Sequence, residues 1–203
     1  RAAMKQYIVA TIAVALLGVT GCGTGVRTYE SWQSTPAQSA RPQARDSLAV
    51  EAMLKPGSSL AVEFGVSGAQ LDEGGGTAPA LLYELPAFDG VHVLTVTSKP
   101  RGGERGPGIV YPRVRLLDAQ RVPTREFTSG RFIYRDGLQA TIFFNPIDRR
   151  ERYVLVTSEA VPENRQLRFQ SASSAPSPAL AAFDRGVLVV DFRPVPIEHV
   201  PFP

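Results

Sequence analysis

The sequence predicts an all-β domain, a β-sandwich or jelly-roll-like fold of about eight strands. Several short segments carry apolar residues at every second position, and Gly, Pro and Asp are concentrated in the joints between them. No stretch of the expected domain combines a 3.6-residue apolar period with helix caps. The 203 residues include 18 Gly and 17 Pro, and this length suits one domain with additional terminal segments. Short, regular strands separated by turn residues are typical of sandwiches.

The first expected strands lie before residue 100. Leu60–Val66 has an apolar side chain at every second position, as a half-buried strand requires. Ala80–Leu85 is a second, short apolar run. Val91–Ser98 is rich in β-branched residues and almost continuously apolar, which predicts a strand covered on both faces.

The segment Ile109–Asp118 predicts a strand with two unlike faces. Val114 and Leu116 point to one side, and Arg113 and Arg115 point to the other. We therefore expect the arginines to lie on an outward face.

A hairpin is expected where Asp136-Gly137 separates two further strands, because this dipeptide is typical of two-residue turns. The remaining expected strands are Arg131–Arg135, Leu138–Phe144, Arg152–Ser158 and Gly186–Phe192.

The first 21 residues are typical of a secretory signal peptide. Lys5 precedes Tyr7–Val19, an uncharged run too short as a helix to cross the roughly 30 Å core of a bilayer. Residues 19–22 resemble the bacterial lipobox, which implies that Cys22 receives the lipid anchor. Gly23 implies sorting to the outer membrane, facing the periplasm. The alternative is an ordinary secretion signal in which Cys22 is incidental.

Four parts are expected along the chain. Residues 1–21 form the signal peptide, and residues 22–50 carry Cys22 and a linker rich in Ser, Gln, Pro and Ala. Residues 51–193 form the sandwich. Residues 194–203 form an extended tail, because Pro recurs there.

Charge and composition exclude several classes of function. Removing Arg1 and Lys5 with the signal peptide leaves 22 minus 2 basic residues against 19 acidic ones, so the net charge falls from +3 to +1. A nearly neutral exported protein is not expected to bind nucleic acid. One cysteine and two histidines give no basis for a metal site or a cofactor.

Six segments of the expected domain resemble, in order, the MalM family of periplasmic proteins encoded in maltose operons. The most specific piece has Pro112, Val114, Leu117 and Asp118, followed by the run Tyr153–Val156. The resemblance implies a periplasmic role associated with carbohydrate transport, without an assigned enzymatic activity. The segments are Ser59–Gly68, Ala78–Pro86, His92–Ser98, Tyr111–Pro123, Phe132–Tyr134 and Arg152–Ser158.

Arginines give the first candidate binding surface. Between Arg101 and Arg152 there are eleven arginines, no lysine and six acids. Arginine binds carboxylates and phosphates through two parallel hydrogen bonds, so peptidoglycan or lipopolysaccharide would suit such a surface. The alternative is an ordinary solvated sheet face. The candidates are Arg113, Arg115, Arg131 and Arg135.

Aromatic side chains give the second candidate surface, because they stack on sugar rings. Most aromatic residues in strands are instead expected to pack in the core. Tyr111 and Tyr134 are the candidates. No nucleophile motif with a neighbouring base is present, and both His92 and His199 are expected to be structural. We therefore expect no catalytic residues.

Together these observations predict a lipid-anchored periplasmic accessory protein of carbohydrate transport, which binds a glycan or an outer-membrane porin. The alternative is an envelope scaffold that binds peptidoglycan, lipopolysaccharide or a larger membrane complex through its arginines.

Overall fold

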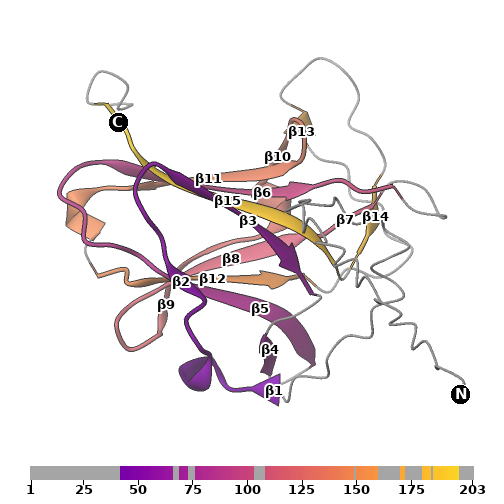
Figure 1. Cartoon of the computed structure of the whole chain (residues 1–203), viewed down its shortest axis with the longest axis horizontal. Coiled ribbons are helices and arrows are strands. Elements are labelled where there is room, and N and C mark those ends of the chain that lie inside the picture. Colours follow the sequence, from indigo (N-terminus) through magenta and orange to yellow (C-terminus); the bar gives the residue numbers. More distant parts are fainter. Residues whose placement is uncertain are drawn as a thin grey trace, which may run out of the picture.

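The computed structural model describes most of the chain from residue 42 to residue 196. The expected all-β sandwich is confirmed: two β-sheets lie one above the other, with the six-stranded sheet on top in the view of Figure 1. The signal peptide, Cys22, His199 and most of the linker lie outside the described residues. The described ranges are 42–65, 69–72, 76–102, 108–148, 150–159, 170–171, 180–183 and 185–196.

The seven-stranded sheet has the order β1-β4-β5-β12-β8-β9, and β2 also pairs with β5. Most neighbours are antiparallel, but β1 and β2 pair in parallel with β4 and β5. Its strands are β1 (Pro42–Gln43), β2 (Ala52–Met53), β4 (Ala69–Asp72), β5 (Thr77–Glu84), β8 (Pro112–Leu117), β9 (Pro123–Phe127) and β12 (Tyr153–Ser158).

The six-stranded sheet has the order β13-β10-β11-β6-β15-β3. Strand β6 lies in its middle and is buried along most of its length, as its continuous apolar sequence predicts. A short pair, β7 with β14, and three 3-10 turns are the other elements of the described residues. The elements are β3 (Ser58–Phe64), β6 (His92–Lys99), β10 (Ile133–Tyr134), β11 (Leu138–Phe144), β13 (Gln170–Ser171), β15 (Gly186–Pro194), β7 (Gly108–Ile109), β14 (Ala181–Ala182), η1 (Arg45–Ser47), η2 (Ser129–Arg131) and η3 (Pro146–Asp148).

The main core fills the space between the two sheets. Alternate residues of each strand point into it, so the period-two pattern of the sequence becomes a continuous apolar layer. Its fully buried members include Phe64, Leu94, Val114, Val154 and Phe192.

A second, smaller apolar cluster lies on the outer face of the seven-stranded sheet. Leu82 and Leu155 contribute to it from neighbouring strands, and Leu48 packs onto them from the segment that follows η1. The sequence predicts that residues 42–50 belong to the linker. In the structure β1, η1 and Leu48 belong to the folded part. The folded domain therefore includes residues 42–50 as well as the residues from 51 onward.

The expected hairpin is present, with Tyr134 paired to Leu138 and three residues between them rather than two. Gly137 has no positive φ, so the turn does not need glycine for that reason. An added Cβ at Gly137 would lie 2.4 Å from the carbonyl oxygen of Ser98, and this close approach is what requires glycine.

Candidate functional site

Arg113 and Arg115, the two arginines of β8, both form ion pairs with Glu126 of the same domain. The side chain of Glu126 on β9 accepts a hydrogen bond from Nε of Arg115 at 2.9 Å and lies 3.6 Å from Nε of Arg113. Arg115 is only 8% exposed. Alternation along the strand predicted the direction of these side chains correctly, but Arg115 is not part of an open arginine face, because it is buried and paired with Glu126 on the neighbouring strand β9.

Arg131 and Arg135 lie elsewhere. Both are exposed and flank β10 in the six-stranded sheet, whereas Arg113 and Arg115 are on β8 of the seven-stranded sheet. The four candidate arginines are therefore not brought to one surface.

The candidate tyrosines are packing residues. Tyr111 is 1% exposed, and its hydroxyl donates a hydrogen bond to the carbonyl of Leu180 at 2.7 Å. Tyr134 is half-buried and packs against the main core. The ring of Tyr111 is therefore closed to a sugar, and core packing covers part of Tyr134.

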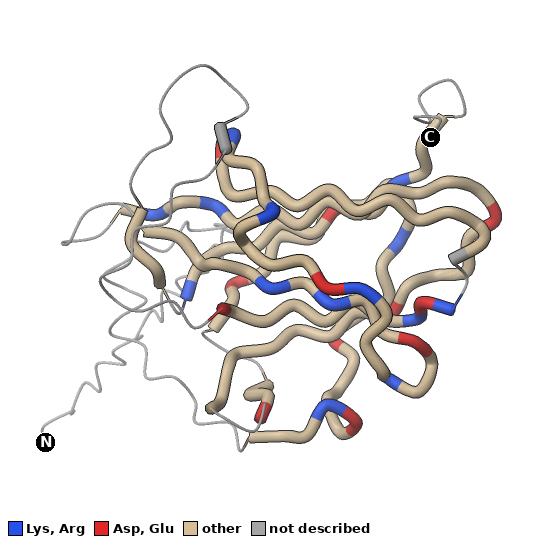
Figure 2. The backbone as a smooth tube through the Cα atoms, turned by 180° about the vertical axis from the view of Figure 1, so that it is seen from behind, with Lys and Arg blue, Asp and Glu red and all other residues tan. Residues whose placement is uncertain are grey.

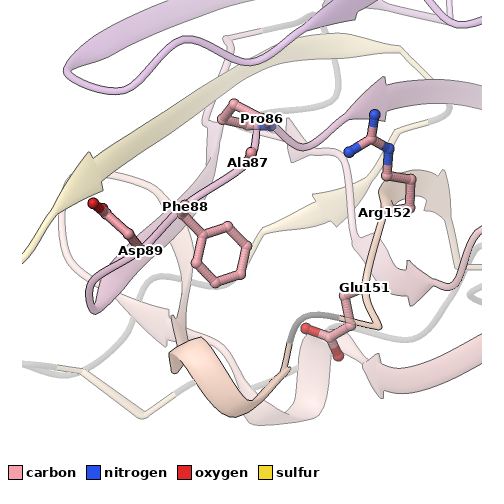
Figure 3. A pocket seen from close by; sticks show the side chains of 6 residues that line it. All are labelled: Pro86, Ala87, Phe88, Asp89, Glu151 and Arg152. Atoms are coloured by element: carbon pink, nitrogen blue, oxygen red, sulfur yellow. The ribbon is translucent and has the colours of Figure 1, made fainter.

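A pocket of about 560 Å³ opens at one end of the sandwich. One wall is the loop between β5 and β6, and the other is the segment just before β12. In Figure 3 the ring of Phe88 and the carboxylate of Glu151 point toward each other across the open space, whereas the carboxylate of Asp89 is turned away. The lining residues are Pro86, Ala87, Phe88, Asp89, Glu151 and Arg152.

The apolar side of the pocket rests on an aromatic cluster. Phe88 packs edge-on against Phe144 and Phe192, with ring centroids 5.8 and 6.4 Å away. The ring of His92 stacks on Phe192 at 5.0 Å, and its Nδ1 lies 3.0 Å from the carbonyl oxygen of Gly90. This cluster holds Phe88 in place at the end of the main core.

The polar side of the pocket is fixed by Glu151, a buried carboxylate. Nε of Arg125 donates to its Oε1 at 2.7 Å and Nη2 donates to its Oε2. The hydroxyl of Thr124 also donates to Oε1, at 3.0 Å. Because both oxygens already accept hydrogen bonds, Glu151 shapes the wall and is not available as a free base.

The rim carries charges of both signs. Arg152 is exposed and forms an ion pair of 2.7 Å with Glu84, and the carboxylate of Asp89 faces solvent. An apolar ring beside exposed donors and acceptors suits a ligand with one apolar face and several hydroxyl groups.

Sequence reasoning missed this pocket because its residues come from two loops that are far apart in the chain. The one local signal was Phe88, a large aromatic residue inside a turn-rich connection, where binding residues are often found.

The described part of the chain has no group of three His, Cys, Asp or Glu side chains that could bind a metal ion. Within the same residues, no helix is long and apolar enough to cross a membrane.

No protein-family model and no curated protein matches the chain. Among solved structures it is similar to the pre-peptidase C-terminal domain of a collagenase from Bacillus anthracis, at 10% sequence identity and a TM-score of 0.35. The match covers 71% of this chain and 97% of that one. This similarity is too distant to indicate what the chain binds.

Proposed function

We propose that this chain is a lipid-anchored, non-enzymatic accessory protein of carbohydrate uptake, which faces the periplasm from the outer membrane and binds glycan in the pocket at the end of its sandwich. The anchor is Cys22, and the residues after it form the tether. The resemblance to the MalM family and the lipobox-like residues 19–22 support this assignment.

The pocket is the observation that carries the proposal. Phe88 supplies an apolar ring that is held by aromatic neighbours, and the exposed guanidinium of Arg152 supplies a donor at the rim. A pyranose ring has an apolar face and a polar edge, so it matches this lining. A volume of about 560 Å³ lies within the range of small-ligand sites.

The scaffold alternative loses part of its support. It depended on an open arginine face, and Arg113 and Arg115 share the carboxylate of Glu126.

The proposal is tested by calorimetric titration of residues 23–203 with maltodextrins of increasing length. We expect saturable binding that strengthens with length. Phe88→Ala should weaken it at least about tenfold, because stacking on an aromatic ring supplies much of such binding. Phe143→Ala removes an exposed ring that does not line the pocket, and should leave binding unchanged.

A second variant separates lost binding from lost folding. Arg152 is exposed, so Arg152→Gln should keep the thermal unfolding midpoint while weakening the glycan interaction. Heat indistinguishable from dilution for the unmodified chain would reject glycan binding. Pull-down from solubilised outer membrane would then test a porin partner.

The anchor has its own test. Palmitate labelling should be lost in Cys22→Ala, and unchanged labelling would reject the assignment of Cys22.

A further inference from the structure

An aspartate directly precedes a glycine at two places in the chain, Asp89-Gly90 and Asp136-Gly137. The first pair lies in the loop between β5 and β6, which forms one wall of the pocket. The second lies in the turn between β10 and β11. In such a pair the main-chain nitrogen of the glycine can close on the side-chain carboxyl of the aspartate, because glycine has no Cβ to obstruct the approach. The surroundings of each pair decide whether this reaction proceeds.

The carboxyl group of Asp89 is not held in place. The side chain is exposed, and in Figure 3 its carboxyl points away from the pocket. Asp89 forms no hydrogen bond or ion pair with the part of the chain that the structure describes. Its carboxyl can therefore turn back toward the main chain without breaking an interaction.

The main-chain nitrogen of Gly90 is also available. Its N–H donates no hydrogen bond within the described residues. A Cβ added at Gly90 would meet nothing within 4 Å, so the space around this residue is open. The carbonyl oxygen of Gly90 lies 3.0 Å from Nδ1 of the buried His92, which fixes the chain just after the reacting nitrogen.

The pair Asp136-Gly137 is held in the opposite way. Nζ of Lys99 donates a hydrogen bond to Oδ2 of Asp136 and keeps the pKa of that carboxyl below its ordinary value. Figure 2 shows basic and acidic residues side by side at this turn, in the upper left of the rear view. A Cβ added at Gly137 would lie 2.4 Å from the carbonyl oxygen of Ser98, so there is little space for a ring. Ring closure here would have to break the ion pair and displace β6.

We propose that Asp89 is a site of spontaneous isomerisation to isoaspartate, and that the ion pair with Lys99 protects Asp136 from the same reaction. The nitrogen of Gly90 attacks Cγ of the protonated Asp89 carboxyl. The N–Cγ bond forms, the bond from Cγ to the hydroxyl oxygen breaks, and this hydroxyl leaves as water with the amide proton.

Water then opens the five-membered succinimide ring. Attack at Cγ restores aspartate, whereas attack at the main-chain carbonyl leaves the chain running through Cβ and Cγ, which is isoaspartate. Water is the one co-reactant, and no atom is oxidised or reduced. The product has one more carbon atom in the main chain of the pocket wall, between Phe88 and the anchored carbonyl of Gly90. The inference does not depend on what the pocket binds.

Incubation of residues 23–203 in neutral buffer over several weeks tests the proposal. This part of the chain contains every described strand and both apolar clusters. Digestion followed by electron-transfer fragmentation in a mass spectrometer distinguishes isoaspartate from aspartate at each position. We expect isoaspartate to accumulate several-fold faster at residue 89 than at residue 136. Equal accumulation at the two positions, or faster accumulation at residue 136, would overturn the proposal.

Two variants and one control identify the cause. Gly90→Val places a branched side chain beside the reacting nitrogen, in open space, and should slow isomerisation at residue 89 about tenfold. Lys99→Met releases the carboxyl of Asp136 and should raise the rate at residue 136 several-fold, and an unchanged rate there would reject protection by the ion pair. In concentrated urea the rates at residues 89 and 136 should become similar. The same ratio in the folded and the unfolded chain would show that the structure does not select Asp89.

Discussion

Arg125 and Glu151 form a two-point ion pair beside the pocket, between β9 and the residues that lead into β12 of the same sheet. Nε of Arg125 lies 2.7 Å from Oε1 of Glu151, and Nη2 bonds the second oxygen. Nη1 of the same guanidinium donates to the carbonyl of Phe143 at 3.0 Å, and the group lies 5.2 Å from the ring of Phe144. One side chain of β9 thus contacts β11 of the other sheet and the residue before β12.

Arg125→Met should lower the free energy of unfolding by about 3 kcal/mol, because it leaves the buried carboxylate of Glu151 without its charged partner. Urea unfolding measures the loss. Arg193→Met is the matched control. Its guanidinium is exposed and lies 3.8 Å from Asp191, so its removal should cost less than about 0.5 kcal/mol. Equal losses in the two variants would contradict this role of Arg125.

Tyr83 and Tyr111 are buried alike but differ in their hydroxyl groups. The hydroxyl of Tyr83 has no hydrogen-bond partner among the described residues, whereas that of Tyr111 donates to Leu180. Tyr83→Phe should therefore leave the free energy of unfolding at pH 7 unchanged or raise it by about 1 kcal/mol, and Tyr111→Phe should lower it by about 1–2 kcal/mol. Urea unfolding of both variants decides this, and the reverse order would reject the assignment.

Burial, with a smaller contribution from the charge of Glu51, raises the pKa of Tyr83 from 10.0 to about 12. Because the unfolded chain loses this proton first, stability is retained below pH 10 and falls as the pH rises toward 12. The loss should be about 2–3 kcal/mol. In Tyr83→Phe the free energy of unfolding should fall less between pH 10 and pH 12. An identical fall in the variant and the unmodified chain would contradict the raised pKa of Tyr83.

The sequence pattern predicted the strands better than it predicted the side chains and segments that pack on the two sheets. Alternation of apolar residues located β3 and a continuous β-branched run located β6, because side-chain direction and strand propensity are local properties. It did not show that Arg115 is buried, because that depends on Glu126 and β9. The packing of Leu48 likewise depends on strands far along the chain, and so does the pocket beside Phe88. Such contacts are set by long-range pairing, which no local period encodes.

Arg121 should hold the N-terminal segment against the sheet. Its Nη1 lies 3.0, 2.8 and 2.8 Å from the carbonyl oxygens of Arg45, Asp46 and Leu48, and its guanidinium lies 5.3 Å from the ring of Tyr153. Arg121→Ala should lower the free energy of unfolding by about 2–3 kcal/mol, since hydrogen bonds from a charged donor are lost.

Hydrogen exchange of this variant should rise in residues 42–54 and stay unchanged in the central strand β6. Uniform acceleration across the domain would mean that Arg121 has no local role. Arg121→Lys keeps the charge but cannot reproduce the planar guanidinium, so it should recover only part of the protection.

Gly137→Ala should destabilise the hairpin between β10 and β11. The added Cβ would lie 2.4 Å from the carbonyl oxygen of Ser98, a backbone atom that cannot rotate away, so β6 or the turn must shift. We expect a loss of about 2 kcal/mol or more, as for other overpacked sites. Gly130→Ala is the matched control, because nothing lies within 4 Å of its added Cβ, and it should stay within about 0.5 kcal/mol of the unmodified chain. Thermal and urea unfolding measure both. A tolerated alanine at residue 137 would show that the turn does not approach β6 this closely and that the hairpin does not require glycine.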